Sequence, residues 1–230
     1  MAAAENHLIE LLPRPARLRL LAICETVPLV LSDVLYERGQ PVGHVHFPID
    51  GFVSLIAQID GHSGLEVGMV GREGMVGAPL VLGLVQAPLQ ALVQGPGSAR
   101  RADAAAFQRE LALSPALQGV MNRYLGVLMA QLASSAACLR FHLIAPRLAR
   151  WLLMSQDRAH ADHFHVTHEF LSCMLGVRRV GITNAAVALQ RDGLIRYRRG
   201  DVTVVDRSGL EALACGCYAS DRAAYVQALG

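Results

Sequence analysis

The sequence predicts an α+β protein with a strand-rich amino-terminal region, a long central helix and a carboxy-terminal winged helix-turn-helix. Three observations favour this fold class. Short apolar runs separated by Gly, Pro and Asp extend from about residue 27 to 112. A stretch of about 30 residues after Ser114-Pro115 is nearly free of helix breakers, and two helix patterns joined by a glycine turn precede a hairpin pattern at 195–205. The 230 residues are enough for one large domain or two small ones.

The amino-terminal region begins with apolar spacing over residues 5–24 that predicts one or two short helices. The runs VLYERG, HVHFPIDGFVSLIAQI, LEVGMV and LQALVQG then predict strands. Gly39-Gln40-Pro41, Asp50-Gly51 and Asp60-Gly61 are turn signals between them. Several short strands at this spacing indicate an antiparallel barrel or sandwich.

The central segment, residues 115–145, predicts a helix about 45 Å long. Ser114 is a good cap and Pro115 a good first helical residue. Apolar residues occupy more than one face of this helix, so we expect one face to pack on the strands and another on a second copy of the chain. The alternative is a helix buried within a single core.

The carboxy-terminal third contains several further elements. Pro146 predicts a break before a second amphipathic helix that carries Trp151. Thr167 is placed to cap a short helix, and Gly176 to end it in a left-handed turn. A second helix is expected from about Arg178 to Arg191, followed by a hairpin over 195–205 with Gly200-Asp201 at its tip. One side of this unit would bury Phe170, Leu171, Met174, Leu175, Val177, Ile182, Ala186 and Leu189.

Composition excludes several classes of protein. The apolar fraction of 53% indicates a globular chain, and no run of 18 apolar residues suggests a membrane span. The amino terminus lacks a basic signal region, so a cytoplasmic protein is expected. The sequence has no phosphate-binding glycine loop, no serine elbow and no HExxH motif, so we expect no enzyme. Residues 139–208 hold eleven arginines against six acids, which places the basic excess in the last third.

The segment THEFLSCMLGVRRVGITNAAVALQRDGLI has the pattern T-x-x-x-L-x-x-x-L-G-V-x-R. With this motif, and with VLYERGQPVGHVHFPIDGFVSL and VGREGMVG, the chain resembles the CRP/FNR family of bacterial transcription factors over about residues 27–217. The resemblance implies a cyclic-nucleotide-binding-like β-roll of the jelly-roll type within residues 1–113 and a dimerisation helix at 114–145. It further implies a winged helix-turn-helix at 146–217 and a carboxy-terminal tail at 218–230.

The resemblance also implies how DNA would be contacted. Arg179 takes the place of the family's main guanine-reading arginine, and Arg178 precedes it. Val180 replaces a common glutamate and would favour a thymine methyl group, while Asn184 replaces an arginine and would favour adenine. The remaining expected DNA contacts, including phosphate contacts that add affinity more than specificity, are Thr167, His168, Thr183, Arg196, Arg198 and Arg199.

The expected effector site departs from the cyclic-AMP pattern. Family members that bind cyclic AMP have Gly-Glu followed by Arg-Ser, whereas this chain has Gly77-Ala78 and Ala87-Pro88. The cyclic phosphate would lack its charged partner, so cyclic AMP is disfavoured. By position, the expected effector residues are Val76, Gly77, Ala78, Ala87, Leu132 and Ser135. The expected dimerisation residues are Met121, Tyr124, Leu128, Gln131 and Ser135.

No cofactor is evident from the sequence. Only Cys24 lies in the first 60 residues, which argues against the family's amino-terminal iron–sulfur cluster. Haem and metal binding stay open, since His160, His163, His165 and His168, or Cys215 with Cys217, could serve as ligands, although incidental residues are the simpler interpretation. Expected partners are double-stranded DNA, a second copy, RNA polymerase and a small-molecule signal. The alternative is a regulator without an effector, whose β-roll is only structural and contacts RNA polymerase.

Overall fold

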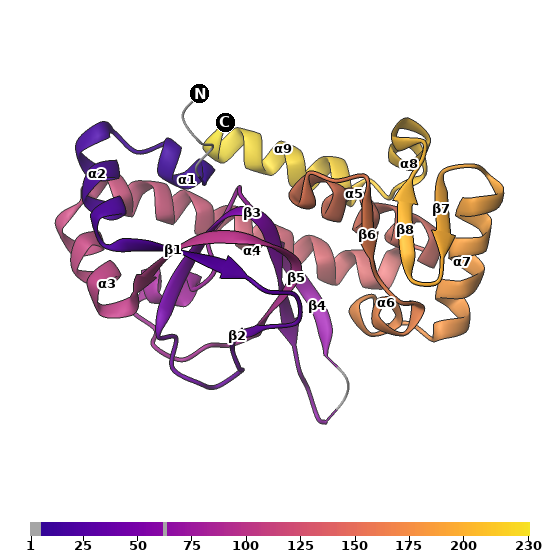
Figure 1. Ribbon diagram of the computed structural model, residues 1–230, viewed down its shortest axis with the longest axis horizontal. Coiled ribbons are helices and arrows are strands. Elements are labelled where there is room, and N and C mark those ends of the chain that lie inside the picture. The colour runs from indigo at the N-terminus through magenta and orange to yellow at the C-terminus, as the bar shows by residue number, and fades with distance from the viewer. Residues whose placement is uncertain (1–5, 62–63) are drawn as a thin grey trace.

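The computed structural model describes residues 6–61 and 64–230, and it places an antiparallel β-roll beside a smaller carboxy-terminal domain (Figure 1). The roll strands pair in the order β1–β5–β3–β4, and β2 also pairs with β5. A mixed fold with an antiparallel sheet and a carboxy-terminal helix-turn-helix confirms the predicted class. The roll contains β1 (Cys24–Leu29), β2 (Val34–Tyr36), β3 (His44–Ala57), β4 (Leu65–Val70), the short 3-10 helix η1 (Ala78–Leu82) and β5 (Gln90–Asp103).

Three helices outside the strands complete the core of the roll. Leu8 in α1 (His7–Glu10), Leu20 in α2 (Arg14–Ala22) and Phe107 in α3 (Ala104–Leu113) are fully buried in the same core as Phe47 of β3. The strand pattern was expected to continue to residue 112, so α3 is a correction. Asp103 caps this helix by accepting a hydrogen bond from the backbone N–H of Ala106 at 3.0 Å.

The Asp50-Gly51 pair does not end a strand, contrary to the sequence expectation. It lies inside β3, where the pairing with β5 shifts on either side of Gly51. Gly51 has a φ of +73°, and a Cβ there would lie 2.4 Å from the carbonyl oxygen of Gly95. The glycine therefore forms a bulge that bends a 14-residue strand around the roll.

Helix α4 (Pro115–Phe141) begins as expected, with the side chain of Ser114 accepting a hydrogen bond from the backbone N–H of Leu117. It ends four residues before the expected position 145. The break falls at His142, which has extended backbone angles, and not at Pro146. Pro146 is the third residue of α5 (Ile144–Ala159), where the missing N–H costs no hydrogen bond.

The carboxy-terminal domain packs its helices and a small three-stranded sheet around α5. Besides α5, the domain contains β6 (His163–His165), α6 (His168–Met174), α7 (Arg179–Arg191), β7 (Ile195–Arg198), β8 (Asp201–Val204) and α8 (Arg207–Leu213). Trp151 of α5 contacts Phe164 edge to face, with the ring centroids 6.2 Å apart.

The hairpin of β7 and β8 turns at Arg199 and Gly200, which have φ values of 54° and 92°. Its tip therefore lies one residue before the expected Gly200-Asp201.

The expected carboxy-terminal tail is a helix, α9 (Cys217–Leu229), which returns across the molecule to the amino-terminal end of the roll (Figure 1). It packs along α4, and Leu229 is buried in the core of the roll. The Tyr225 hydroxyl donates a hydrogen bond to the carbonyl oxygen of Glu73 at 2.9 Å and lies 2.6 Å from Nδ1 of His7. The tail assignment is therefore wrong, because distant apolar and polar partners stabilise this segment as a helix.

A buried carboxyl group connects the roll to the carboxy-terminal domain. The Trp151 indole N–H donates to Glu66 of β4 at 3.0 Å, and the hydroxyl of Ser54 donates to the other carboxylate oxygen. Burial raises the pKa of Glu66 to about 7 in spite of these donors. The folded protein therefore holds a proton on Glu66 over a pH range in which the unfolded chain has released it. This group favours folding most at acidic pH, and its contribution falls as pH rises to about 7.

Replacing Glu66 with Gln should remove this pH dependence. The amide keeps a neutral acceptor for Trp151 without the cost of burying a charge. We expect Glu66→Gln to unfold with a higher free energy than the wild type at pH 8, by on the order of 2 kcal/mol, and with little difference at pH 5. Urea denaturation at both pH values measures this. Glu25→Gln, which alters an exposed ion pair with Arg101, is the control; an equal pH response in both variants would contradict the prediction.

Candidate nucleic-acid interface

Helices α6 and α7 form a helix-turn-helix. A cap at the start of α6, a glycine after its end and a hydrogen bond from α5 hold it in place. The Thr167 side chain caps α6 by accepting from the backbone N–H of Phe170 at 3.1 Å. Gly176 follows the C-cap of α6 with a φ of +60° and so ends this helix in a left-handed conformation, as expected. The buried Arg147 of α5 donates a hydrogen bond to the carbonyl oxygen of Leu175. The turn is therefore attached to the domain core, which gives α7 a defined direction.

Small residues seat α7 closely on α5. Ala185 and Ala186 are buried on the inner face of α7 with Ile182 and Leu189. A Cβ at Gly181 would come within 2.6 Å of Ile144 in α5. The helix can approach this near because its inner face carries few bulky side chains. As a result its other face is displayed to solvent.

The displayed face of α7 carries residues suited to base contacts. Arg178 is the N-cap residue and Arg179 the first helical residue, and both are exposed. The Arg179 guanidinium lies 3.8 Å from the carboxylate of Glu169 in α6, a pair too exposed to hold it firmly. Val180 and Asn184 follow on the same face and are also exposed. The amino terminus of α7 carries a partial positive charge and two exposed guanidinium groups. It is therefore a suitable site for anionic groups.

The sequence reasoning missed Val187. Its side chain is 60% exposed, as is that of Val180 at 62%, and the seven-residue spacing places both on one face of α7. The seven-residue spacing between Val180 and Val187 is visible in the sequence and could have placed Val187 on the same face. Two exposed valines offer apolar contacts of the kind that thymine methyl groups accept.

His168 and Thr183 do not present free polar groups, contrary to the expectation that they touch DNA. Nδ1 of His168 lies 3.1 Å from the Thr183 hydroxyl, and the imidazole stacks on Tyr197 with ring centroids 4.5 Å apart. Burial, and then the charge of Arg179, lowers the pKa of His168, so the ring is neutral at physiological pH. These residues join α6, α7 and the wing, and their expected contacts with DNA stay a prediction.

The wing, strands β7 and β8, is held against α7 by polar contacts. The backbone N–H of Tyr197 donates to the side chain of Gln190 at 2.7 Å, and the Tyr197 hydroxyl donates to the carbonyl oxygen of Val166 at 2.6 Å. Arg196, Arg198 and Arg199 are exposed on this hairpin. Figure 1 shows the hairpin beside α7, so the wing arginines extend the basic surface beyond the helix.

The expected effector residues do not surround a common cavity among the described residues. Val76, Gly77, Ala78 and Ala87 are buried, and Val76 and Ala87 belong to the apolar core of the roll. Leu132 lies next to Gly68 of β4, and Ser135 lies 3.4 Å from the guanidinium of Arg150 in α5. The six residues lie at separate places in the fold, and their assignment to one effector site stays a prediction.

The expected dimerisation residues of α4 face inward. Met121 and Tyr124 are buried in the core of the roll, and the Tyr124 hydroxyl donates to the carbonyl oxygen of Met75. Leu128 and Gln131 line a cavity below α9, and Ser135 faces α5. Met121 and Tyr124 are therefore unavailable to a second copy, whereas Leu128, Gln131 and Ser135 are half-buried. The opposite face of α4 is exposed instead, along Gly126, Met129, Ala130, Ala133 and Ala137.

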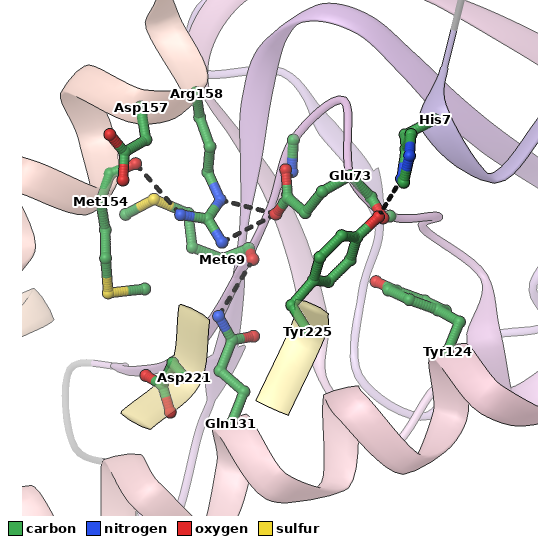
Figure 2. A network of polar contacts seen from close by, with 12 residues as sticks. His7, Met69, Glu73, Tyr124, Gln131, Met154, Asp157, Arg158, Asp221 and Tyr225 are labelled. Atoms are coloured by element: carbon green, nitrogen blue, oxygen red, sulfur yellow. Dashed lines mark hydrogen bonds and ion pairs between the residues drawn. The ribbon is translucent and has the colours of Figure 1, made fainter. Parts of the chain in front are cut away.

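The cavity has a volume of about 260 Å³ and lies where the roll, α4, α5 and α9 meet (Figure 2). Arg158 of α5 forms an ion pair with Glu73 of the roll at 2.7 Å across one side. Burial raises the pKa of Tyr124 and Tyr225, so both hydroxyls stay protonated. The lining residues are Met69, Glu73, Tyr124, Val127, Leu128, Gln131, Met154, Asp157, Arg158, Tyr218, Asp221, Arg222, Ala224, Tyr225 and Val226.

The histidines before the helix-turn-helix do not form a group able to hold a metal among the described residues. His165 hydrogen-bonds to Asp201 at 2.9 Å and His168 to Thr183, so each has its own structural contact. Cys215 and Cys217 do come together with other possible ligands, Cys138 and His142.

Comparisons with known proteins agree with this geometry. The family model of the Crp-like helix-turn-helix domain matches residues 146–213. No curated protein matches the sequence significantly. Among solved structures, the c-di-GMP-responsive regulator CLP of Xanthomonas campestris has a TM-score of 0.68 at 20% identity, covering 84% of this chain and 99% of its own. FixK2 of Bradyrhizobium japonicum has a TM-score of 0.68 at 14% identity, with coverages of 84% and 98%.

A CRP/FNR-family regulator of Thermus thermophilus has a TM-score of 0.68 at 23% identity and covers 83% of this chain and 98% of its own. Identities this low bear on the fold, whereas the family model bears on the helix-turn-helix itself. The resemblance to the CRP/FNR family is thus confirmed: the chain has the fold of CRP/FNR-type transcription regulators, and its residues 146–213 are a Crp-like helix-turn-helix domain.

Proposed function

We propose that this protein binds a near-palindromic DNA site as a homodimer and thereby regulates transcription. The observation that carries the proposal is the displayed face of α7, with Arg178 and Arg179 at its amino terminus and the wing arginines beside it. In a two-fold dimer the two copies of α7 would enter successive major grooves about 34 Å apart. The activity requires no catalytic residue, and a DNA-bound regulator would work in the cytoplasm.

Each residue of the displayed face has a distinct proposed role. The Arg179 guanidinium would donate two hydrogen bonds to guanine, and Asn184 would pair with adenine. Val180 and Val187 would pack on thymine methyl groups. Arg178, Arg196, Arg198 and Arg199, with the exposed Thr167, would contact phosphates and contribute salt-dependent affinity.

The dimer would form through the exposed face of α4. Within the described residues, α4 is the one helix long and apolar enough, by length and composition only, to cross a membrane, and 22% of its most apolar window is buried. Met129 is 70% exposed on this face, among small residues that permit close helix contact. A second copy could place the same face of its α4 against this one. Both exposed faces, from Gly126 to Ala137, would then be buried, as a symmetric interface requires.

The cavity below α9 is the proposed place for a regulatory signal. Its walls come from the roll, from α4 and from α5, which leads into the DNA-binding domain. A small molecule bound there would contact all three, so it could change their relative positions. The observation that the roll interior is filled supports the alternative, a regulator without an effector whose roll is structural and contacts RNA polymerase.

Substitution of Arg179 should separate base reading from phosphate binding. We expect Arg179→Ala to cost about 1–3 kcal/mol in binding to the selected site and to relax preference at one base position. Arg198→Ala should weaken all sequences alike and reduce the salt dependence by about one phosphate contact. Titrations at several salt concentrations measure both effects. Arg109→Ala, an exposed arginine on α3, is the control; a uniform loss with Arg179→Ala would contradict base reading.

A charged residue on the exposed face of α4 should abolish the dimer. We expect Ala133→Arg to sediment as a monomer at micromolar concentration, since two arginines would face each other across the two-fold axis. Ala105→Arg, on the exposed surface of α3, should remain dimeric. A monomeric wild type, or a dimeric Ala133→Arg protein, would show that this face of α4 does not dimerise.

Cyclic AMP should not bind. The segment from Gly77 to Leu89 contains no arginine for a cyclic phosphate, and Ala78 and Ala87 are buried by their neighbours. Isothermal titration with millimolar cyclic AMP should give no saturable heat, and the thermal midpoint should not rise. Saturable binding would show that the roll opens a site that the structure keeps filled.

A further inference from the structure

Three cysteines and one histidine converge where α4 ends and α9 begins. Sγ of Cys138 lies 3.5 Å from Sγ of Cys215, and Sγ of Cys217 lies 3.6 Å from Nδ1 of His142. The four possible ligand atoms all lie within 4.8 Å of one another. Cys138 and Cys215 are buried, and the other two are half-buried. Neither the proposed DNA contacts nor the cavity uses these residues.

The fold holds this cluster in place from two sides. Cys138 and His142 are four residues apart, so their side chains lie on one face at the end of α4. Cys215 and Cys217 flank Gly216 at the amino terminus of α9. The backbone N–H of Cys215 donates to the carbonyl oxygen of Pro146 at 3.4 Å, which connects this segment to α5. The ligands therefore come from two segments that are distant in sequence and separately anchored.

The spacing of the four atoms suits tetrahedral coordination. With a Zn–S distance of about 2.3 Å, the sulfur atoms of a tetrahedral zinc site lie about 3.8 Å apart. The Cys138–Cys215 and Cys217–His142 separations are close to that edge length. A disulfide would require sulfur atoms about 2.05 Å apart. The arrangement thus resembles an assembled Cys3His ligand set more than a cystine.

Two buried arginines lie beside the cluster. The guanidinium groups of Arg147 and Arg150 lie near enough to Cys138 to interact with its charge. Arg150 Nη2 forms an ion pair with Asp221 at 2.6 Å, while its Nε is buried and has no hydrogen-bond partner among the described residues. Three thiolates and a neutral imidazole around Zn²⁺ carry one net negative charge, which these buried arginines would offset.

We propose that Cys138, His142, Cys215 and Cys217 bind one Zn²⁺ ion per chain. Thiolate-rich tetrahedral sites with one imidazole select zinc over the harder divalent cations. On binding, the three thiols release their protons to solvent and Nδ1 of His142 donates its lone pair, with its ring proton on Nε2. The ion fastens the start of α9 to the end of α4 beside the His142 break. The site stands independently of the proposed DNA-binding function.

The experiment uses full-length protein purified with reductant. Elemental analysis should find one zinc per chain, and replacement by Co²⁺ should give the intense visible bands of tetrahedral cobalt with thiolate charge transfer. Cys138→Ser and Cys217→Ser should each lower zinc affinity by more than about 100-fold, since even outer-shell changes cost 10–100-fold. Cys173→Ser, a thiol of α6 outside the cluster, should bind zinc as the wild type does.

Stability gives a second measurement. Chelation should lower the thermal midpoint of the wild type and of Cys173→Ser, and leave the midpoint of Cys138→Ser unchanged. Circular dichroism of each variant shows whether it is folded before metal is added. Absence of metal from the reduced wild type, full occupancy in folded Cys138→Ser, octahedral cobalt spectra, or a Cys138–Cys215 disulfide in the reduced preparation would each overturn the proposal.

Discussion

The burial of one side of α4 is the contact on which the rest of the molecule depends. Met121 and Tyr124 close the core of the roll, and the same helix continues past the roll to carry Cys138 and His142. Once the inner side is committed to the roll, the position of every other residue of α4 is determined by the helical repeat. Its remaining sides face α9, α5 and solvent, so one rigid element sets the position of the cavity, the cysteine cluster and the exposed stripe.

Helix α9 gives this architecture its second constraint. It covers one of the sides of α4 that the roll leaves open. Its polar residues contact three regions: Tyr225 contacts the roll and His7 of α1, and Asp221 and Tyr218 contact Arg150 and Asp157 of α5. The matched helix-turn-helix domain ends at residue 213, before this helix. The cavity exists because α9 lies across the junction, and a ligand there would meet side chains from the roll, α4, α5 and α9.

Local signals account for what could be predicted from the sequence. The Thr167 and Ser114 caps, the left-handed Gly176 and the alternation of apolar residues are each read within a few positions, and the helices at 115, 168 and 179 begin where those signals place them. The predictions that failed depended on contacts between residues distant in the sequence. Two apolar faces of α4 are visible in the sequence, but only packing decides which one the roll takes, so Met121 and Tyr124 were assigned to the wrong side.

The same reason explains the other misses. His168 and Thr183 look like polar surface residues until Tyr197, far along the chain, stacks on the imidazole. Cys138 and Cys215 are 77 positions apart, so no spacing rule joins them. Ala78 and Ala87 predict a roll without a phosphate partner, yet they could not show that apolar side chains pack in the core around them.

The contact between Tyr225 and His7, 218 positions apart, has a consequence for the order of folding. The core of the roll includes Leu229, so the roll cannot complete its packing before α9 has been synthesised. The carboxy-terminal domain, whose core spans mostly residues 148–218, has nearly all of its own chain before then. On a nascent chain all residues of the later domain's core are therefore made before the last contact of the roll core can form.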